Sequence, residues 1–154
     1  MKVGMISFAH LHATSYASAL LEMPWVEFVG IYDEDNDRAK EWASKLGVKH
    51  FEKLDDLLKT DIEAVIICST NADHCHYTVK AAEAGKHVLV EKPIATTIED
   101  ANKMIETCKK NNVKLQIAFP VRYMPAVIEA KNIVQSGKLG RILAIKGTNH
   151  GSMP

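Results

Sequence analysis

The sequence has 154 residues with 19 basic and 19 acidic side chains, so its formal net charge is zero. No basic run or stripe suggests nucleic-acid binding, and no segment approaches the ~20 apolar residues that span a bilayer. Nor does the N-terminus have the layout of a signal peptide. Cys68, Cys75 and Cys108 contain no CxxC pair, which argues against a disulfide framework and favours a reducing, cytoplasmic compartment.

Short β-branched, apolar runs alternate with helical patterns along residues 1–118. Six of these runs are too short for helices and are mostly bounded by turn or cap residues, which favours strands. We expect strands at Val3–Phe8, Val26–Tyr32, Val48–Phe51, Ala64–Cys68, His87–Val90 and Lys114–Ala118.

Helix signals lie between these runs. Residues 36–47 repeat apolar side chains at helical spacing and end in Gly47, a residue typical of helix ends. Residues 73–85 begin with Asp73 as a candidate cap, and Thr96 with Glu99 forms a capping box for the next helix. Strand–helix alternation implies a parallel sheet covered on both faces, which is a doubly wound, Rossmann-like α/β domain.

The last part of the chain has a different pattern. Residues 123–140 predict one more helix, and "RILAIKGTNHGSMP" then begins a strand that has no obvious partner. We therefore expect one domain over residues 1–120 and a separate segment over residues 121–154. The strand either adds to a sheet edge or begins a second domain that this chain essentially lacks.

"ISFAHLHATS", residues 6–15, stands where a dinucleotide-binding domain has its glycine fingerprint. Ser7, Ala9 and His12 replace the three glycines, and only the third replacement is bulky. Free amides and the helix dipole can form an anion site without glycine. The stretch is therefore either a cradle for a pyrophosphate or an ordinary turn. The candidate cradle residues are Ser7, Phe8, Ala9, His10 and Leu11.

Asp33 follows the second expected strand. An acidic residue about 20 residues past the fingerprint binds the ribose hydroxyls of a dinucleotide, and a carboxylate there repels a 2′-phosphate. This spacing favours NAD over NADP. Alternatively, Asp33 only starts the turn before the next helix, in which Arg38 covers the surface.

A metal site is the other interpretation of the histidines. His10, His12, His74, Cys75 and His76 are residue types that bind zinc. We expect H-x-H in a turn and H-C-H in a helical turn to direct their side chains apart, and no recognised ligand spacing emerges. The sequence therefore predicts no metal, with Cys75 in the core and the histidines at polar edges.

Residues 64–97, "AVIICSTNADHCHYTVKAAEAGKHVLVEKPIATT", contain the most specific motif. They closely resemble the fourth and fifth strand region of the Gfo/Idh/MocA oxidoreductases, the family of glucose–fructose oxidoreductase and inositol dehydrogenase. Ser69-Thr70-Asn71, His74 and the "AGKHVLVEKP" of residues 84–93 carry the resemblance. Residues 119–140 resemble the segment that leads into the second domain of this family, and the first turn is the main departure.

The resemblance implies an NAD(P)-dependent oxidoreductase that transfers hydride between nicotinamide and a hydroxyl or carbonyl of a sugar, polyol or related small molecule. It places Glu91 and Lys92 beside the nicotinamide. Lys92, which we expect to be partly buried, acts as the catalytic residue that binds the substrate oxygen. Ser69, Thr70, Asn71 and His74 would contact the ribose and nicotinamide.

The family also has a second α/β domain, which contributes an Asp-x-x-x-His pair and the usual oligomer interface. We expect the full-length protein to be a homo-oligomer, and this chain alone to bind cofactor but turn over poorly. Two alternatives remain open: a non-catalytic dinucleotide-binding or sensing module, favoured by the glycine-poor turn, and a domain whose nucleotide site has decayed.

Overall fold

A computed structural model describes residues 1–148. The chain divides into two compact units, the first spanning Met1–Ala118 and the second beginning at Phe119. Among the described residues, none of the helices combines the length and the apolar character needed to cross a membrane.

The first unit is built on six parallel strands in the order β3-β2-β1-β4-β5-β6. All six expected strands are confirmed, and most are one or two residues shorter than predicted. They are β1 (Lys2–Ile6), β2 (Glu27–Tyr32), β3 (Lys49–Phe51), β4 (Ala64–Ile67), β5 (His87–Val90) and β6 (Leu115–Ile117).

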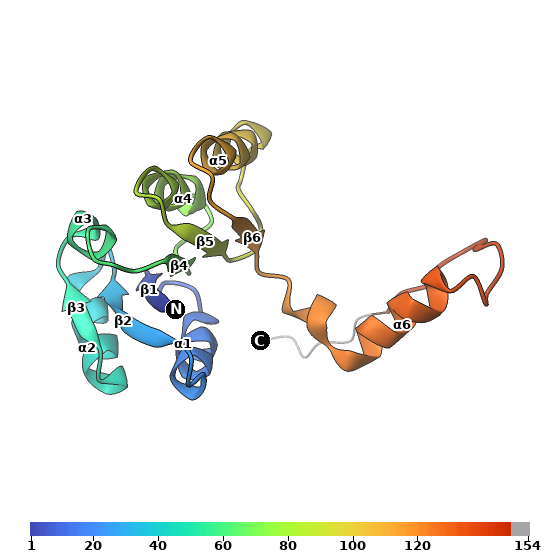
Figure 1. Cartoon of the computed structure of the whole chain (residues 1–154), viewed down its shortest axis with the longest axis horizontal. Coiled ribbons are helices and arrows are strands. Elements are labelled where there is room, and N and C mark those ends of the chain that lie inside the picture. Colours follow the sequence, from blue (N-terminus) through green and yellow to red (C-terminus); the bar gives the residue numbers. More distant parts are fainter. Residues whose placement is uncertain (149–154) are drawn as a thin grey trace. The chain divides into compact units, whose positions relative to one another are not determined.

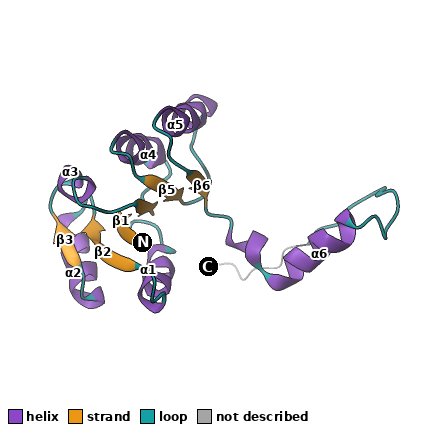
Figure 2. Cartoon of the chain, in the orientation of Figure 1, coloured by secondary structure: helices purple, strands orange, loops and turns teal. Residues whose placement is uncertain are grey.

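Helices cover both faces of this sheet (Figures 1 and 2). They are α1 (Ala13–Glu22), α2 (Asn36–Leu46), α3 (Leu54–Leu58), α4 (His74–Glu83) and α5 (Ile98–Lys110). Leu20 of α1 and Ala43 of α2 belong to one apolar cluster, whereas Leu57 of α3, Ala81 of α4 and Met104 of α5 belong to the other. This arrangement is the predicted doubly wound α/β fold.

The two apolar clusters explain why the strands are apolar without interruption. Successive side chains of a strand point to opposite faces. In β1, Met5 accordingly joins the cluster that contains α1, and Ile6 joins the cluster that contains α4. Both side chains are fully buried. The three cysteines are buried and free, as expected from their spacing.

Two helix starts differ from the predicted caps. Thr97, not Thr96, caps α5, because its Oγ1 accepts a hydrogen bond of 3.1 Å from the amide of Asp100. Asp73 stands at the cap position of α4 without a side-chain bond to that helix, since its carboxylate accepts from the Thr70 hydroxyl instead. The predicted end of α2 is confirmed, and Gly47 has the left-handed φ of 67°.

The second unit contains the 3₁₀ helix η1 (Pro120–Tyr123) and α6 (Pro125–Gln135), which confirms the expected helix. The strand predicted from Arg141 onward is wrong for residues 141–148, which form no strand pairing in the described chain. A strand needs a partner ladder, and none is supplied to this segment. Residues 149–154 of that prediction lie outside the described residues.

Candidate functional site

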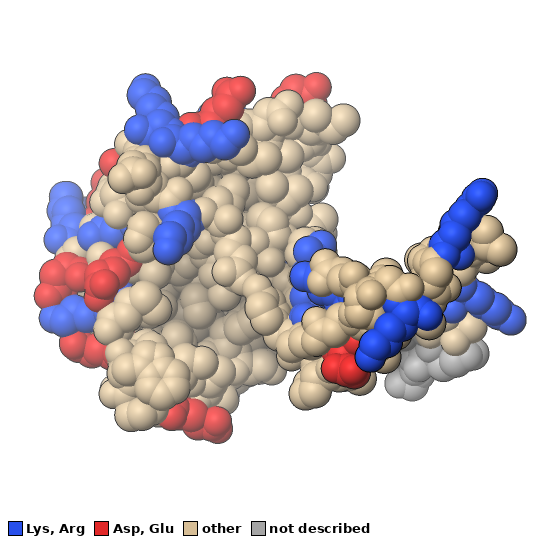
Figure 3. All heavy atoms as spheres, turned by 45° about the vertical axis from the view of Figure 1, so that its right-hand side comes forward, with Lys and Arg blue, Asp and Glu red and all other residues tan. Residues whose placement is uncertain are grey.

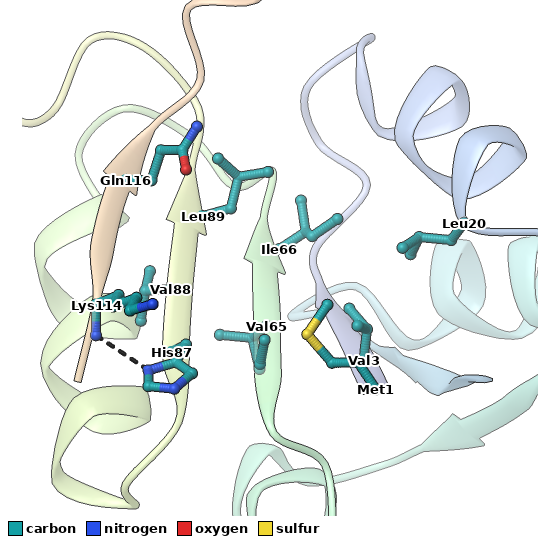
Figure 4. Close-up of a pocket in the computed structure, with 11 residues that line it drawn as sticks. Met1, Val3, Leu20, Val65, Ile66, His87, Val88, Leu89, Lys114 and Gln116 are labelled. Carbon is teal, nitrogen blue, oxygen red and sulfur yellow. Dashed lines mark hydrogen bonds between the residues drawn. The ribbon is translucent and has the colours of Figure 1, made fainter. Parts of the chain in front are cut away.

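A cavity of about 310 Å³ lies on the sheet and is lined mainly by apolar side chains (Figure 4). Its lining includes Met1, His87 and Lys114, which stand at the amino ends of β1, β5 and β6. Open parallel sheets bind their ligands beyond the carboxyl ends of the strands. The candidate site therefore lies beyond the carboxyl ends of the strands and not in this cavity.

Charge does not single out a site on the face drawn in Figure 3. Basic and acidic side chains are interspersed there around the first unit, and a broad area carries neither. The site is instead defined by the register of the strands. Ile6 pairs with Tyr32 and with Ile67, and Ile67 pairs with Val90, so the segments that follow these four residues begin at one edge.

The turn after β1 begins at Ser7, which has a φ of 66°. This left-handed conformation costs a residue other than glycine about 1 kcal/mol, and it is the conformation for which the fingerprint uses its first glycine. Ser7 is held there by three hydrogen bonds. Its amide donates to the carbonyl of Tyr32 at 2.7 Å, and its hydroxyl donates to Glu34 and accepts from the amide of Ala9.

Of the five residues predicted to form the cradle, only Leu11 has an amide without an acceptor in residues 1–148. The amide of Ala9 donates to the Ser7 hydroxyl at 3.2 Å, and that of His10 donates to the carbonyl of Cys68 at 2.9 Å. Within residues 1–148, the amides of Leu11, Thr14 and Ser15 have no acceptor. The amides of Thr14 and Ser15 belong to the first turn of α1 and that of Leu11 precedes it, so all three lie at the end where the helix dipole is positive.

Asp33 is the most enclosed carboxylate of the site, and its side chain is 0% exposed. It accepts hydrogen bonds from the amides of Phe8 at 2.6 Å and Asp35 at 3.0 Å. The Arg38 guanidinium donates to both of its oxygens, at 2.8 and 2.6 Å. Burial opposes ionisation of Asp33, but the Arg38 guanidinium and the two amides hold the pKa of this carboxyl below its usual value.

Glu34 presents the accessible carboxylate at the end of β2. Its side chain is 35% exposed, in contrast to that of Asp33. One oxygen accepts from the Ser7 hydroxyl at 3.1 Å and from Arg38 at 2.9 Å, and the other accepts from the Tyr77 hydroxyl at 3.4 Å. Sequence reasoning missed Glu34, because the spacing rule points to the first acidic residue after the strand.

The segment after β4 contains four of the predicted site residues. Ser69 is buried and Thr70 and Asn71 are exposed. His74, at the start of α4, is fully buried, and its Nδ1 donates to the carbonyl of Pro93 at 2.8 Å. Its Nε2 is buried without a hydrogen-bond partner in the described chain. His74 therefore joins the loop after β4 to the loop after β5.

Glu91 follows β5 and is 1% exposed. Its Oε1 accepts from the Tyr16 hydroxyl at 2.7 Å and lies 2.9 Å from His12 Nδ1, while its Oε2 accepts from the Lys92 amide at 3.0 Å. Burial opposes ionisation, but the bonds from Tyr16 and His12 keep the pKa of Glu91 below its usual value. Lys92 is exposed, contrary to the expected partial burial.

The prediction that His10 and His12 point apart is wrong. Their rings lie 4.6 Å apart, centroid to centroid, in an edge-to-face arrangement. The amide of His12 donates to His10 Nδ1 at 3.2 Å, which folds the turn back on itself. The two residues are close in sequence, but the bond joins a backbone amide to a histidine ring. The spacing of metal ligands in a sequence motif does not predict such a bond.

Comparison with known proteins identifies the first unit. The model of the Gfo/Idh/MocA family, described as an oxidoreductase family with an NAD-binding Rossmann fold, matches residues 1–119. The glucose-6-phosphate 3-dehydrogenase of Bacillus subtilis is 34% identical over 145 residues, which cover 94% of this chain and 41% of that protein. The inositol 2-dehydrogenase of Salmonella typhimurium is 32% identical over 97% of this chain and 44% of its own length.

A solved structure has the same fold. A probable dehydrogenase from Thermotoga maritima superimposes with a TM-score of 0.84 at 30% identity, over 91% of this chain and 42% of that one. The chain thus spans less than half the length of the relatives that it matches.

The Asp33 cluster yields a prediction about stability. Asp33→Asn keeps the shape of the side chain but removes its charge, and we expect a loss of about 2 kcal/mol of unfolding free energy at pH 7. Since the folded-state pKa of Asp33 lies below its ordinary 3.8, this stabilisation is present above pH 3.8 and disappears as the pH falls through the folded-state pKa.

Urea unfolding of both proteins between pH 7 and pH 2.5 measures this difference. The stabilities should converge in acid. A gap of constant size down to pH 2.5 would show that the ionised carboxylate of Asp33 does not hold the cluster.

Proposed function

The chain belongs to the Gfo/Idh/MocA oxidoreductase family, and on that basis we propose that it binds NAD for a dehydrogenase acting on a sugar or polyol. One observation carries this proposal. The free amides of α1, the carboxylate of Glu34 and the side chain of Lys92 belong to segments that leave the same edge of the sheet.

The pyrophosphate fits the amino end of α1. The unpaired amides of Leu11, Thr14 and Ser15 are donors, and the helix dipole adds positive potential. Leu11 and Ser15 are exposed, so a ligand has access to them. In this proposal Ser7, Phe8, Ala9 and His10 shape the turn, and the donors to the phosphates come from the first turn of the helix.

The adenosine ribose fits Glu34. Asp33 already accepts four hydrogen bonds from the protein, so we assign it to positioning: it joins the amide of Phe8 to Arg38. Glu34 has the exposed carboxylate that accepts from ribose hydroxyls. Around Arg38, the three acidic residues Asp33, Glu34 and Asp35 outnumber one guanidinium, which disfavours the 2′-phosphate of NADP and favours NAD.

The reacting end of the site fits Lys92. When bound, the nicotinamide ring supplies the hydride donor or acceptor. Lys92 is exposed and free to bind the hydroxyl or carbonyl oxygen of a substrate, and its ammonium stabilises negative charge on that oxygen. Glu91 anchors the Lys92 backbone amide through Oε2. The segment after β4 contributes four further residues to this end of the site: Ser69, Thr70, Asn71 and His74.

The substrate class comes from the relatives. One relative is named for its action on glucose 6-phosphate and another for its action on inositol, which are both polyhydroxylated. We propose a substrate of that class. In this proposal, selection among such substrates depends on groups outside Met1–Ala118.

Cofactor preference provides the first test. We expect the chain to bind NADH at least about tenfold more tightly than NADPH, and Glu34→Arg to reverse or abolish that preference by replacing repulsion of the 2′-phosphate with attraction. Nicotinamide fluorescence and titration calorimetry measure both affinities.

Glu52→Arg is the matched control, since it makes the same charge change at an exposed residue beyond β3. It should leave the preference unaltered. Absence of NADH binding at millimolar concentration would refute the cofactor site, and equal affinities in the unaltered chain would refute the role of Glu34.

Catalysis by Lys92 provides the second test. In the full-length protein, assayed with NAD and a panel of hexoses, hexose phosphates and inositols, Lys92→Met should lower kcat about 10²–10³-fold. NADH affinity should change less than twofold. Lys80→Met, on the exposed side of α4, serves as the control. An unchanged kcat would remove Lys92 from the chemistry and favour a module that only binds the dinucleotide.

A further inference from the structure

Three metal-binding side chains converge beside the site. His10 and His12 come from the turn before α1, and Glu91 comes from the end of β5. One ligand atom from each of these residues lies within 4.8 Å of the other two. In the described chain this group unites two elements that are about 80 residues apart in sequence, so it does not arise from local spacing.

The fold itself brings these residues together. β1 and β5 both pair with β4, and the amide of His10 donates to the carbonyl of Cys68 directly after β4. The turn is thereby held over the end of β4, where Glu91 is its neighbour on the other side. His12 Nδ1 and Glu91 Oε1 share a hydrogen bond of 2.9 Å, and an ion bound by both residues would displace the proton of that bond. The rings of His10 and His12 are 4.6 Å apart.

Supporting contacts fix the carboxylate. The Tyr16 hydroxyl donates to Glu91 Oε1, and the Lys92 amide donates to Oε2. Such secondary hydrogen bonds orient the ligands of metal sites and tune their affinity.

We propose that His10, His12 and Glu91 bind a divalent transition-metal ion, with zinc the best match, and leave one coordination position open. Two imidazole nitrogens and one carboxylate form the ligand set of open zinc sites, in which water or substrate oxygen takes the fourth position. Imidazole ligands favour zinc and its neighbours over magnesium and calcium.

The open position lies in the same region as Lys92, which directly follows Glu91. A hydroxyl or carbonyl oxygen is therefore the chemical class of ligand that we expect to complete the coordination. Lys92 and the amino end of α1 bring positive charge to this region, which should make the site weaker than a closed zinc site with four protein ligands. The metal site does not depend on the proposed function, because its ligands all lie in this chain and its binding is measured without cofactor.

Binding of the metal alone tests the proposal. The chain is titrated with Zn²⁺ by calorimetry and with Co²⁺ by visible absorption, after treatment with a chelator. We expect one ion per chain and Co²⁺ bands without a thiolate charge-transfer band. His10→Ala and His12→Ala should each weaken binding at least about a hundredfold, and Tyr16→Phe, which removes only a supporting bond, about tenfold.

His76→Ala is the matched control, because His76 is an exposed histidine of α4 outside the cluster. It should bind Zn²⁺ like the unaltered chain. The far-ultraviolet circular dichroism of each variant establishes that it is folded, and His10→Ala is the principal variant because His10 is only half-buried.

Three results would overturn the metal site: no saturable binding, equal binding by folded His10→Ala, or a thiolate band that assigns the ion to a cysteine. NADH titration in the presence of chelator separates this proposal from the proposed function. Binding of NADH together with any of the three results would contradict the metal site alone.

Discussion

The buried carboxylate of Asp33 is the interaction on which the rest of the site depends. It joins the turn after β1, through the amide of Phe8, to α2, through Arg38. A carboxylate with no exposure is tolerated only when its charge is paired and its oxygens are hydrogen-bonded, and here both conditions hold. Asp33 thus fixes the turn after β1 against α2, whereas the neighbouring Glu34 keeps a carboxylate that is 35% exposed.

Ser7 shows how a fingerprint without glycine keeps the same backbone. A left-handed φ at this position is disfavoured for serine, yet the hydroxyl of Ser7 bonds both Glu34 and the amide of Ala9, which glycine cannot do. The Ser7 hydroxyl occupies the amide of Ala9, and the carbonyl of Cys68 occupies that of His10. In residues 1–148, the amides of this region without an acceptor are those of Leu11, directly after His10, and of Thr14 and Ser15 in the first turn of α1.

The strands, the doubly wound fold and the family were predictable, because apolar runs and the motif around Glu91 and Lys92 are local in sequence. Contacts over long separations were not. The approach of His12 and Tyr16 to Glu91 depends on the strand order, which sequence periodicity does not contain. A spacing rule also does not show that Arg38 already donates hydrogen bonds to both carboxylate oxygens of Asp33. The five-residue α3 is too short for a helical period, and the strand expected after Arg141 lacks a partner ladder in the described residues.

In the proposed cofactor site, the amino end of α1 receives the dinucleotide phosphates in a turn without glycine. The most direct measurement is a titration of the ¹⁵N-labelled chain with NADH, followed by amide chemical shifts. We expect the largest shifts at Leu11, Thr14 and Ser15, with smaller shifts at Ala9 and His10, whose amides already have acceptors in the protein. Shifts confined to other parts of the sheet, or no shifts at millimolar NADH, would contradict it.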